Sequence, residues 1–145
     1  MQYMKLLEKN LSWGNKICEG VSDADIFALE QKIGKKFPLS YKEFLTLAGE
    51  YFPYTGDVMS FSDLEYIQEK IKEELIKFGF SIEREYWAFE VFDGSQFFIF
   101  YWDEGEDPPV YLCMPCYVQN GAVLLEKNTT SFSEFINRSI NYYKK

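Results

Sequence analysis

The chain of 145 residues contains no histidine. Imidazole is the side chain best suited to proton transfer near neutral pH and the commonest metal ligand, so its absence excludes His-based catalytic triads and His-containing metal sites. Asp, Glu, Lys, Cys and Tyr remain available for catalysis. The composition nevertheless favours a binding protein over an enzyme, and we expect no catalytic residue, no bound metal and no cofactor.

Long apolar runs are also missing. No stretch reaches the ~18 apolar residues that a membrane-spanning helix requires. The opening ten residues, MQYMKLLEKN, lack the charged and apolar regions of a secretion signal. Only three cysteines occur, Cys18, Cys113 and Cys116, and any single pairing leaves one thiol free. These features predict a protein of the reducing cytoplasm that does not associate with membranes.

Basic side chains are scarce in one segment, residues 83–107. It holds eight acidic residues and a single basic one, Arg84, so its net charge of −7 nearly equals the −8 of the whole chain. Nucleic acids and anionic membranes bind clustered Lys and Arg and are therefore disfavoured as direct ligands. A basic protein partner or a cation fits this charge better, although solubility alone explains much acidic surface.

The size and the aromatic content indicate one self-sufficient domain. Residues 1–145 contain no repeat and no low-complexity linker. A chain of this length buries roughly 68–70% of its unfolded surface and needs neither a disulfide nor a metal to fold. Aromatic residues make up 19% of the chain, a high share that favours strands and large core contacts.

Four patterns of Ser followed three residues later by Asp or Glu predict helix starts, because the two residues can cap the first turn. The four serines are Ser22, Ser40, Ser62 and Ser131. Glycines suited to ending the first three helices follow, at Gly34, Gly49 and Gly79.

Strand-forming residues fill the interval between the third and fourth helices. The expected strands are Tyr86–Phe92, Gln96–Trp102, Val110–Val118 and Ala122–Glu126. Asp93-Gly94 and Asn120-Gly121 are typical of tight hairpin turns between them. Weak alternation in Gln96–Trp102 predicts a central strand covered on both faces. The fold expected is α+β, with a mainly antiparallel sheet of four to six strands, a meander of two hairpins, packed against N-terminal helices and a C-terminal helix.

The loop between the two hairpins is the main candidate for a contact surface. We expect a basic protein partner to meet five residues there: Trp102, Asp103, Glu104, Glu106 and Asp107. Glu83 and Glu85 are expected at its rim. A solvated acidic loop with no ligand is the alternative, and the spacing does not match a calcium-binding EF-hand loop.

Cys113-Met114-Pro115-Cys116 has the spelling of a thioredoxin-like redox motif. That chemistry places the first thiol at a helix N-terminus, where the helix dipole lowers its pKa. Here the pair lies in strand-forming residues that no helix follows, and structural thiols are the favoured interpretation. A small-ligand or thiol-redox protein stays open as a third function.

The order of these elements resembles the SUKH superfamily, the SMI/KNR-type family of bacterial immunity proteins and fungal regulators of cell-wall glucan synthesis. The resemblance extends over residues 20–140. It rests on Leu29-Glu30 and Ile33-Gly34, Phe37-Pro38, Tyr41–Leu45 with Gly49, Trp87-Ala88-Phe89, Asp93-Gly94, Val110-Tyr111 and Phe132–Ile136.

The resemblance implies a fold of helices on a mainly antiparallel sheet and a non-enzymatic role. Bacterial members look like antidotes that bind and block a toxin, often a nuclease. Nucleases tend to be basic because they hold phosphates, and an acidic aromatic face is a suitable counterpart. A regulatory or scaffolding protein akin to the glucan-synthesis regulators is the alternative within the family.

Overall fold

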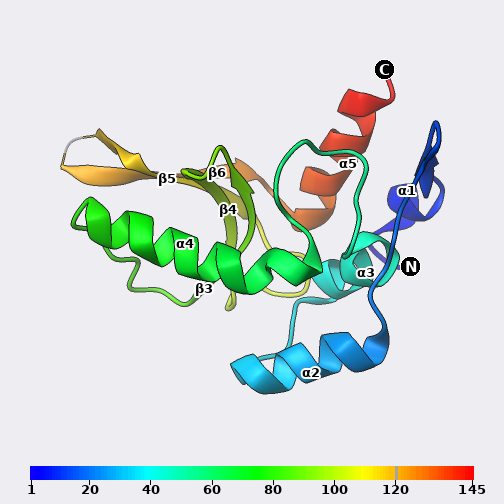
Figure 1. Ribbon diagram of the computed structural model, residues 1–145, viewed down its shortest axis with the longest axis horizontal. Helices are drawn as coiled ribbons and strands as arrows, with labels where there is room; N and C mark the ends of the chain where they lie inside the picture. Colours follow the sequence, from blue (N-terminus) through cyan, green and yellow to red (C-terminus); the bar gives the residue numbers. More distant parts are fainter. Residues whose placement is uncertain (120) are drawn as a thin grey trace.

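The computed structural model describes residues 1–119 and 121–145, which form helices and an antiparallel sheet (Figure 1). The helices are α1 (Lys5–Glu8), α2 (Asp23–Ile33), α3 (Leu39–Ala48), α4 (Leu64–Lys77) and α5 (Phe132–Tyr143), with the 3-10 turn η1 (Phe61–Asp63) before α4. The main sheet has the order β3 (Tyr86–Phe92), β4 (Gln96–Tyr101), β5 (Val110–Gln119), β6 (Ala122–Thr129). A separate small hairpin pairs β1 (Ser12–Trp13) with β2 (Lys16–Ile17). The α+β fold with a four-stranded antiparallel meander is the one that the sequence predicts.

The first hairpin of the sheet turns where the sequence indicates. Asp93 and Gly94 both have positive φ, at 53° and 70°, which is the backbone geometry that tight hairpin turns require. In the second hairpin Gln119 pairs with Ala122. Asn120 of the predicted Asn-Gly turn lies outside the described residues.

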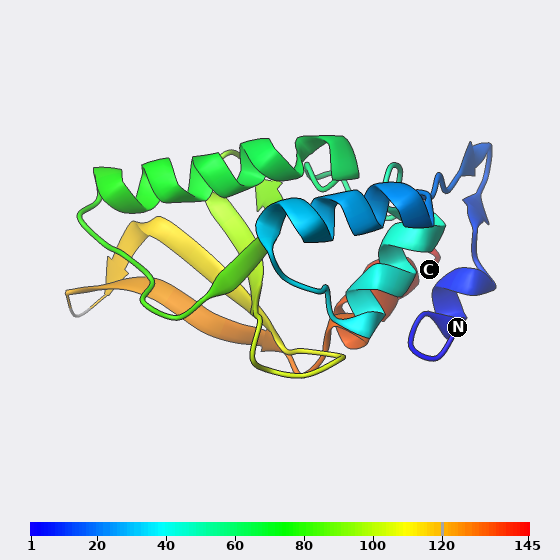
Figure 2. The same cartoon turned by 90° about the horizontal axis from the view of Figure 1, so that it is seen from below.

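The central strand β4 is covered on both faces, which confirms the interpretation of its weak alternation. Phe98 and Phe100 face α5 and α3, with ring centroids 4.9 Å from Phe135 and 5.3 Å from Tyr41 respectively. Successive side chains of a strand point to opposite faces, and Phe97 and Ile99 are accordingly fully buried on the other face. Figure 2 shows α4 running along the sheet there. The aromatic residues of β4 therefore form the core of the domain.

Two of the four predicted helix starts have the expected cap. Ser22 precedes α2, and its hydroxyl accepts a hydrogen bond of 3.2 Å from the backbone N–H of Asp25. Ser131 precedes α5 and accepts a hydrogen bond of 3.1 Å from the backbone N–H of Glu134. Gly34, with φ of 72°, ends α2 as predicted.

The cap predicted at Ser40 is wrong. Helix α3 begins at Leu39, directly after Pro38, whose fixed φ suits a helix start. Ser40 lies inside the first turn, and its backbone N–H donates instead to the Glu106 carbonyl at 2.9 Å. Glu43, the other half of the expected cap, accepts three hydrogen bonds from the backbone N–H groups of residues 2–4. Contacts between distant segments have thus replaced the local cap.

The cap predicted at Ser62 is also wrong. Ser62 lies within η1, and the α-helix begins two residues later, at Leu64. The hydroxyl of Ser60 donates to the Asp63 carboxylate at 2.8 Å and so joins the two ends of the 3-10 turn. The helix is present as predicted, but its first turn is tighter than the pattern suggests.

Candidate functional site

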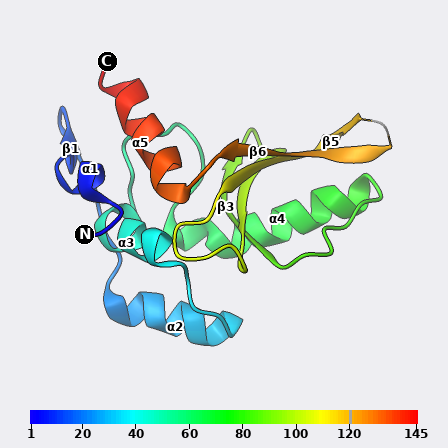
Figure 3. The same cartoon turned by 180° about the vertical axis from the view of Figure 1, so that it is seen from behind.

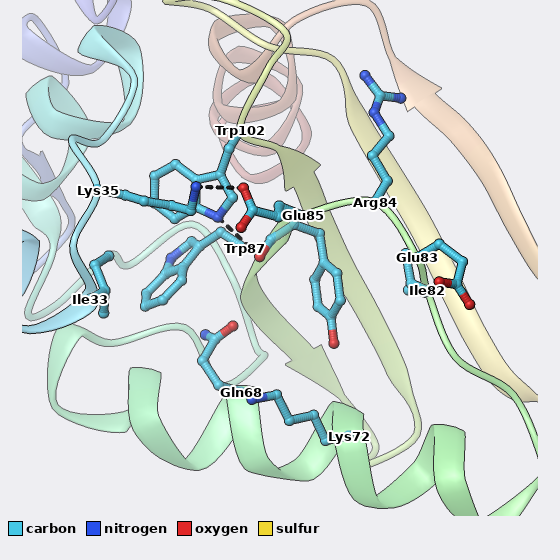
Figure 4. Close-up of a pocket in the computed structure, with 11 residues that line it drawn as sticks. Ile33, Lys35, Gln68, Lys72, Ile82, Glu83, Arg84, Glu85, Trp87 and Trp102 are labelled. Carbon is cyan, nitrogen blue, oxygen red and sulfur yellow. Dashed lines mark hydrogen bonds and ion pairs between the residues drawn. The ribbon is translucent and has the colours of Figure 1, made fainter.

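An open groove of about 460 Å³ lies where the end of α2, helix α4 and the 80–86 segment meet (Figure 4). Its larger apolar and aromatic lining residues are Ile33, Ile82, Tyr86, Trp87 and Trp102. Its polar lining residues are Lys35, Gln68, Lys72, Glu83, Arg84 and Glu85. Three of the seven predicted contact residues, Trp102, Glu83 and Glu85, are therefore brought together in one concave surface, which we call the Trp102 groove.

Trp102 is half-buried and held in a fixed orientation. Its ring stacks on Phe37 with 5.5 Å between centroids, and its indole N–H donates to the carbonyl of Tyr86 at 3.1 Å. The ammonium group of Lys35 lies 5.7 Å from the ring centroid, within the range of a cation–π contact. A large side chain fixed in this way loses little entropy on binding, which makes it a suitable anchor for a partner.

Two acidic residues beside the groove are already paired with basic side chains. Glu85 forms an ion pair with Lys35 at 2.6 Å, drawn as a dashed line in Figure 4. Asp103 accepts hydrogen bonds from the Arg84 guanidinium, the shortest of 2.6 Å, and this guanidinium lowers the pKa of the Asp103 carboxyl. The negative potential of the segment is therefore smaller than its count of acids suggests.

Glu104 and Asp107 are turned toward the protein itself. A carboxylate oxygen of Glu104 accepts a hydrogen bond of 3.2 Å from the Tyr111 hydroxyl. The two oxygens of Asp107 accept from the backbone N–H and the hydroxyl of Ser133, at 2.9 and 2.6 Å. Asp107 thus stabilises the first turn of α5, where a negative charge is favoured by the helix dipole.

Glu83 and Glu106 are the two predicted acids whose charge could meet a partner. Both are exposed, and neither forms an ion pair within residues 1–119 and 121–145. Glu83 lines the Trp102 groove. Glu106 lies in the 103–109 loop, which passes beside α3 in Figure 3, and its carbonyl is the partner of the Ser40 N–H.

Four polar lining residues of the groove were missed by sequence reasoning: Lys35, Gln68, Lys72 and Arg84. Gln68 shows why. Its side-chain amide accepts from the Ala88 N–H at 3.1 Å and donates to the Ala88 carbonyl at 2.5 Å, so α4 satisfies the free edge of β3. Nothing near Gln68 in the sequence signals this contact, because it joins residues twenty positions apart.

The two cysteines of the predicted redox motif lie on a strand. Cys113 is buried on β5, and burial raises the pKa of its thiol to about 12. Cys116 is exposed on the same strand, and both thiols are free. The strand environment matches the sequence interpretation, and a raised thiol pKa disfavours nucleophilic chemistry at Cys113. Among the residues described, no group of three or more acidic or thiol side chains is placed to hold a metal ion.

A scan against protein-family models matches residues 20–138 to the SMI1 / KNR4 family (SUKH-1). The chain belongs to this family. The match covers most of the sequence and confirms the resemblance to the SUKH superfamily, with bounds close to those expected. No curated protein matches the chain.

Membership in SUKH-1 fits either an immunity protein or a regulatory protein, and both act through protein–protein contacts. Within the described ranges of this SUKH-1 chain, no helix has the length and apolar character needed to span a membrane.

Proposed function

We propose that this SUKH-1 protein is a non-enzymatic immunity protein, which neutralises a basic toxin domain by direct binding. The observation that carries the proposal is the Trp102 groove, a concave surface whose lining includes a rigid, half-exposed tryptophan and the exposed Glu83. Nucleases are plausible targets because a protein that holds phosphates has a basic surface.

The chemistry of the groove supports a protein partner over a small polar substrate. Interfaces are typically anchored by a few aromatic residues that need little reordering, surrounded by a charged rim. Trp102 meets the first condition, since Phe37 and the Tyr86 carbonyl fix its ring. Glu83 and, on the neighbouring loop, Glu106 supply unpaired negative charge for electrostatic steering.

The test is to co-express the chain with the toxin domain encoded by an adjacent gene, and to measure growth rescue together with the binding kinetics of the purified pair. We expect Trp102→Ala to weaken binding at least tenfold. The double variant Glu83→Lys/Glu106→Lys is expected to slow association, and added salt should slow it in the original chain. Exposed Glu126 on β6 does not line the groove, and Glu126→Lys controls for a charge reversal outside it, with half of the charge change that the double variant makes.

Glu83 and Glu106 are chosen over Asp107 so that a loss of binding does not arise from a loss of folding. Reversing the charge of Asp107 would also remove the hydrogen bonds at the start of α5, and lost binding would then reflect unfolding. If the double variant binds a cognate toxin as fast as the Glu126→Lys control does, the acidic contact surface lies elsewhere.

A regulatory or scaffolding role is the second candidate, because the family includes both kinds of protein. Affinity purification distinguishes them, since a regulator should recover a complex of endogenous proteins and an immunity protein should recover one toxin. The third candidate, a small-ligand or thiol-redox protein, requires a reactive pair at Cys113 and Cys116. A thiol titration that gives both pKa values near or above ~8.5 removes it.

A further inference from the structure

A second pocket, of about 370 Å³, lies between α5 and the 54–57 segment, with Glu90 of β3 and Phe98 of β4 in its lining. Figures 1 and 3 both show the chain that leads from α3 to α4 passing beside α5, and the space next to Gly56 is bordered by the Tyr143 hydroxyl. Phe98 and Phe135, whose ring centroids are 4.9 Å apart, form an apolar wall. This pocket is separate from the Trp102 groove and shares no lining residue with it.

Glu90 lines this pocket and is an unusual residue to find there. It lies on β3 opposite Phe98, and its side chain is only 4% exposed. A second carboxyl group, that of Asp57, lines the same pocket. Within the described part of the chain, neither acid forms an ion pair with Lys or Arg. A buried carboxylate without a cation is costly, and proteins normally pair such groups.

One positive group, Arg138 of α5, lines the pocket, and it already has partners of its own. Its guanidinium lies 2.9 Å from the Glu134 carboxylate and 3.3 Å from the carbonyl of Asn128. The remaining titratable groups around the pocket are the hydroxyls of Tyr54, Tyr142 and Tyr143. Tyr54 donates to backbone carbonyls of the N-terminal segment, so it does not compensate the two acids either.

We propose that the Asp57–Glu90 pocket binds one basic side chain, a lysine or arginine of a protein partner. The charged end would lie between the two carboxyl groups, and the aliphatic stem would lie against Phe98 and Phe135. This site is independent of the Trp102 groove and of the identity of the toxin. The arrangement meets what a buried basic side chain requires, since it offers paired acceptors at one end and an apolar wall along the stem.

Binding of a cation at this site should change the protonation of Glu90, and that change can be measured. Burial, followed by the hydrogen bond with Asp57, raises the pKa of Glu90 well above its ordinary value, which favours the protonated carboxyl in the empty pocket. An incoming ammonium group favours the charged carboxylate and displaces that proton. Binding of the cation therefore releases up to one proton to the buffer, and affinity should increase with pH by up to tenfold per unit while Glu90 is protonated.

The experiment titrates the protein with butylammonium, propylguanidinium and a blocked Gly-Lys-Gly peptide, at constant ionic strength. Backbone amide resonances report the site of binding, and calorimetry in two buffers of different ionisation enthalpy counts the protons released. We expect saturable shifts around Asp57, Glu90 and Ser139 with all three probes, and proton release. Glu90→Gln should weaken binding at least tenfold and abolish the release, whereas Glu126→Gln, at an exposed acid of β6 outside the pocket, should change the affinity less than twofold.

Three results would overturn the proposal. The first is that none of the probes shifts resonances at the pocket. The second is that Glu90→Gln binds the probes as tightly as the original chain does. If Glu90→Gln does not fold, Asp57→Asn replaces it in the same measurement. The third is that butylammonium binds and the lysine peptide does not, because the pocket would then accept a free amine and exclude a side chain of a protein.

Discussion

The 103–107 loop and the Asp57–Glu90 pocket are both acidic, but they differ in whether their acids have partners. In the loop, Asp103 is held by Arg84, and Asp107 is held by the first turn of α5. In the pocket, Glu90 is buried, and the carboxyl group of Asp57 raises its pKa further. Charge density along the sequence thus indicates the loop, whereas the buried acid without a basic partner lies in the pocket.

This difference teaches how an acidic segment should be interpreted. An exposed acid beside an arginine is an ordinary surface ion pair, which is screened by salt and contributes little. A buried acid is informative because its desolvation has to be offset by something, either a proton or a cation. If the loop and the pocket differ in this way, replacing the buried acid should change stability more than replacing an exposed one.

Replacing Glu90 with Gln should stabilise the protein at neutral pH. Burial raises the pKa of Glu90 in the folded chain well above the value near 4.3 expected in the unfolded chain, so the carboxyl costs stability as the pH rises above that value. The stability of the original chain relative to Glu90→Gln should fall by up to about 1.4 kcal/mol per pH unit from that point, until the folded pKa is passed. Urea denaturation of both proteins between pH 4 and pH 8 measures this difference.

Glu83→Gln is the control for that series. Glu83 is exposed and lies outside the pocket, and its replacement should change the free energy of unfolding by less than about 0.5 kcal/mol. A constant difference between the original chain and Glu90→Gln over the whole pH range would mean that Glu90 is charged in the folded protein, and the contrast with the loop would be lost.

Replacing Asp107 with Ala should destabilise the protein by about 1–2 kcal/mol, the usual cost of losing a side-chain acceptor at a helix start. Its carboxylate accepts two hydrogen bonds from Ser133, at 2.9 and 2.6 Å. The matched control is Glu106→Ala one residue earlier, whose exposed side chain should contribute close to zero. Chemical denaturation gives both values. Equal effects at the two positions would show that Asp107 is a surface acid like Glu106.

Much of the fold was predictable because its signals are local. The Asp93-Gly94 turn, the caps at Ser22 and Ser131 and the apolar strand 96–102 each depend on residues close together in the chain. The cap at Ser62 failed because a local 3-10 turn precedes the helix, whereas the cap at Ser40 failed for the opposite reason. Ser40 meets Glu106 across the domain, and this long-range contact outweighs the local pattern.

The site was only partly predictable for the same reason. Trp102 and Glu83 were found because composition marks their segment, and the groove does bring them together. Composition gave no indication that Lys35 pairs with Glu85 fifty positions later, or that Asp57 meets Glu90. An acid with a distant partner and an acid with none look identical in the sequence, and only the tertiary structure separates them.

The smallest effect is expected for Asp103→Asn, which removes an exposed ion pair with Arg84. Arg84 lowers the pKa of Asp103, so the pair contributes stability above the unfolded pKa of about 3.9 and loses it as the pH falls further. The cost should be smaller than that of Asp107→Ala and should disappear in about 1 M salt, where the screening length is only about 3 Å. A double-mutant cycle with Arg84→Gln, measured by urea denaturation at low and high salt, isolates the pair. A coupling energy that is unchanged in high salt would mean that solvent does not screen the Asp103–Arg84 pair. The loop would then not behave as an exposed surface, and its contrast with the pocket would be lost.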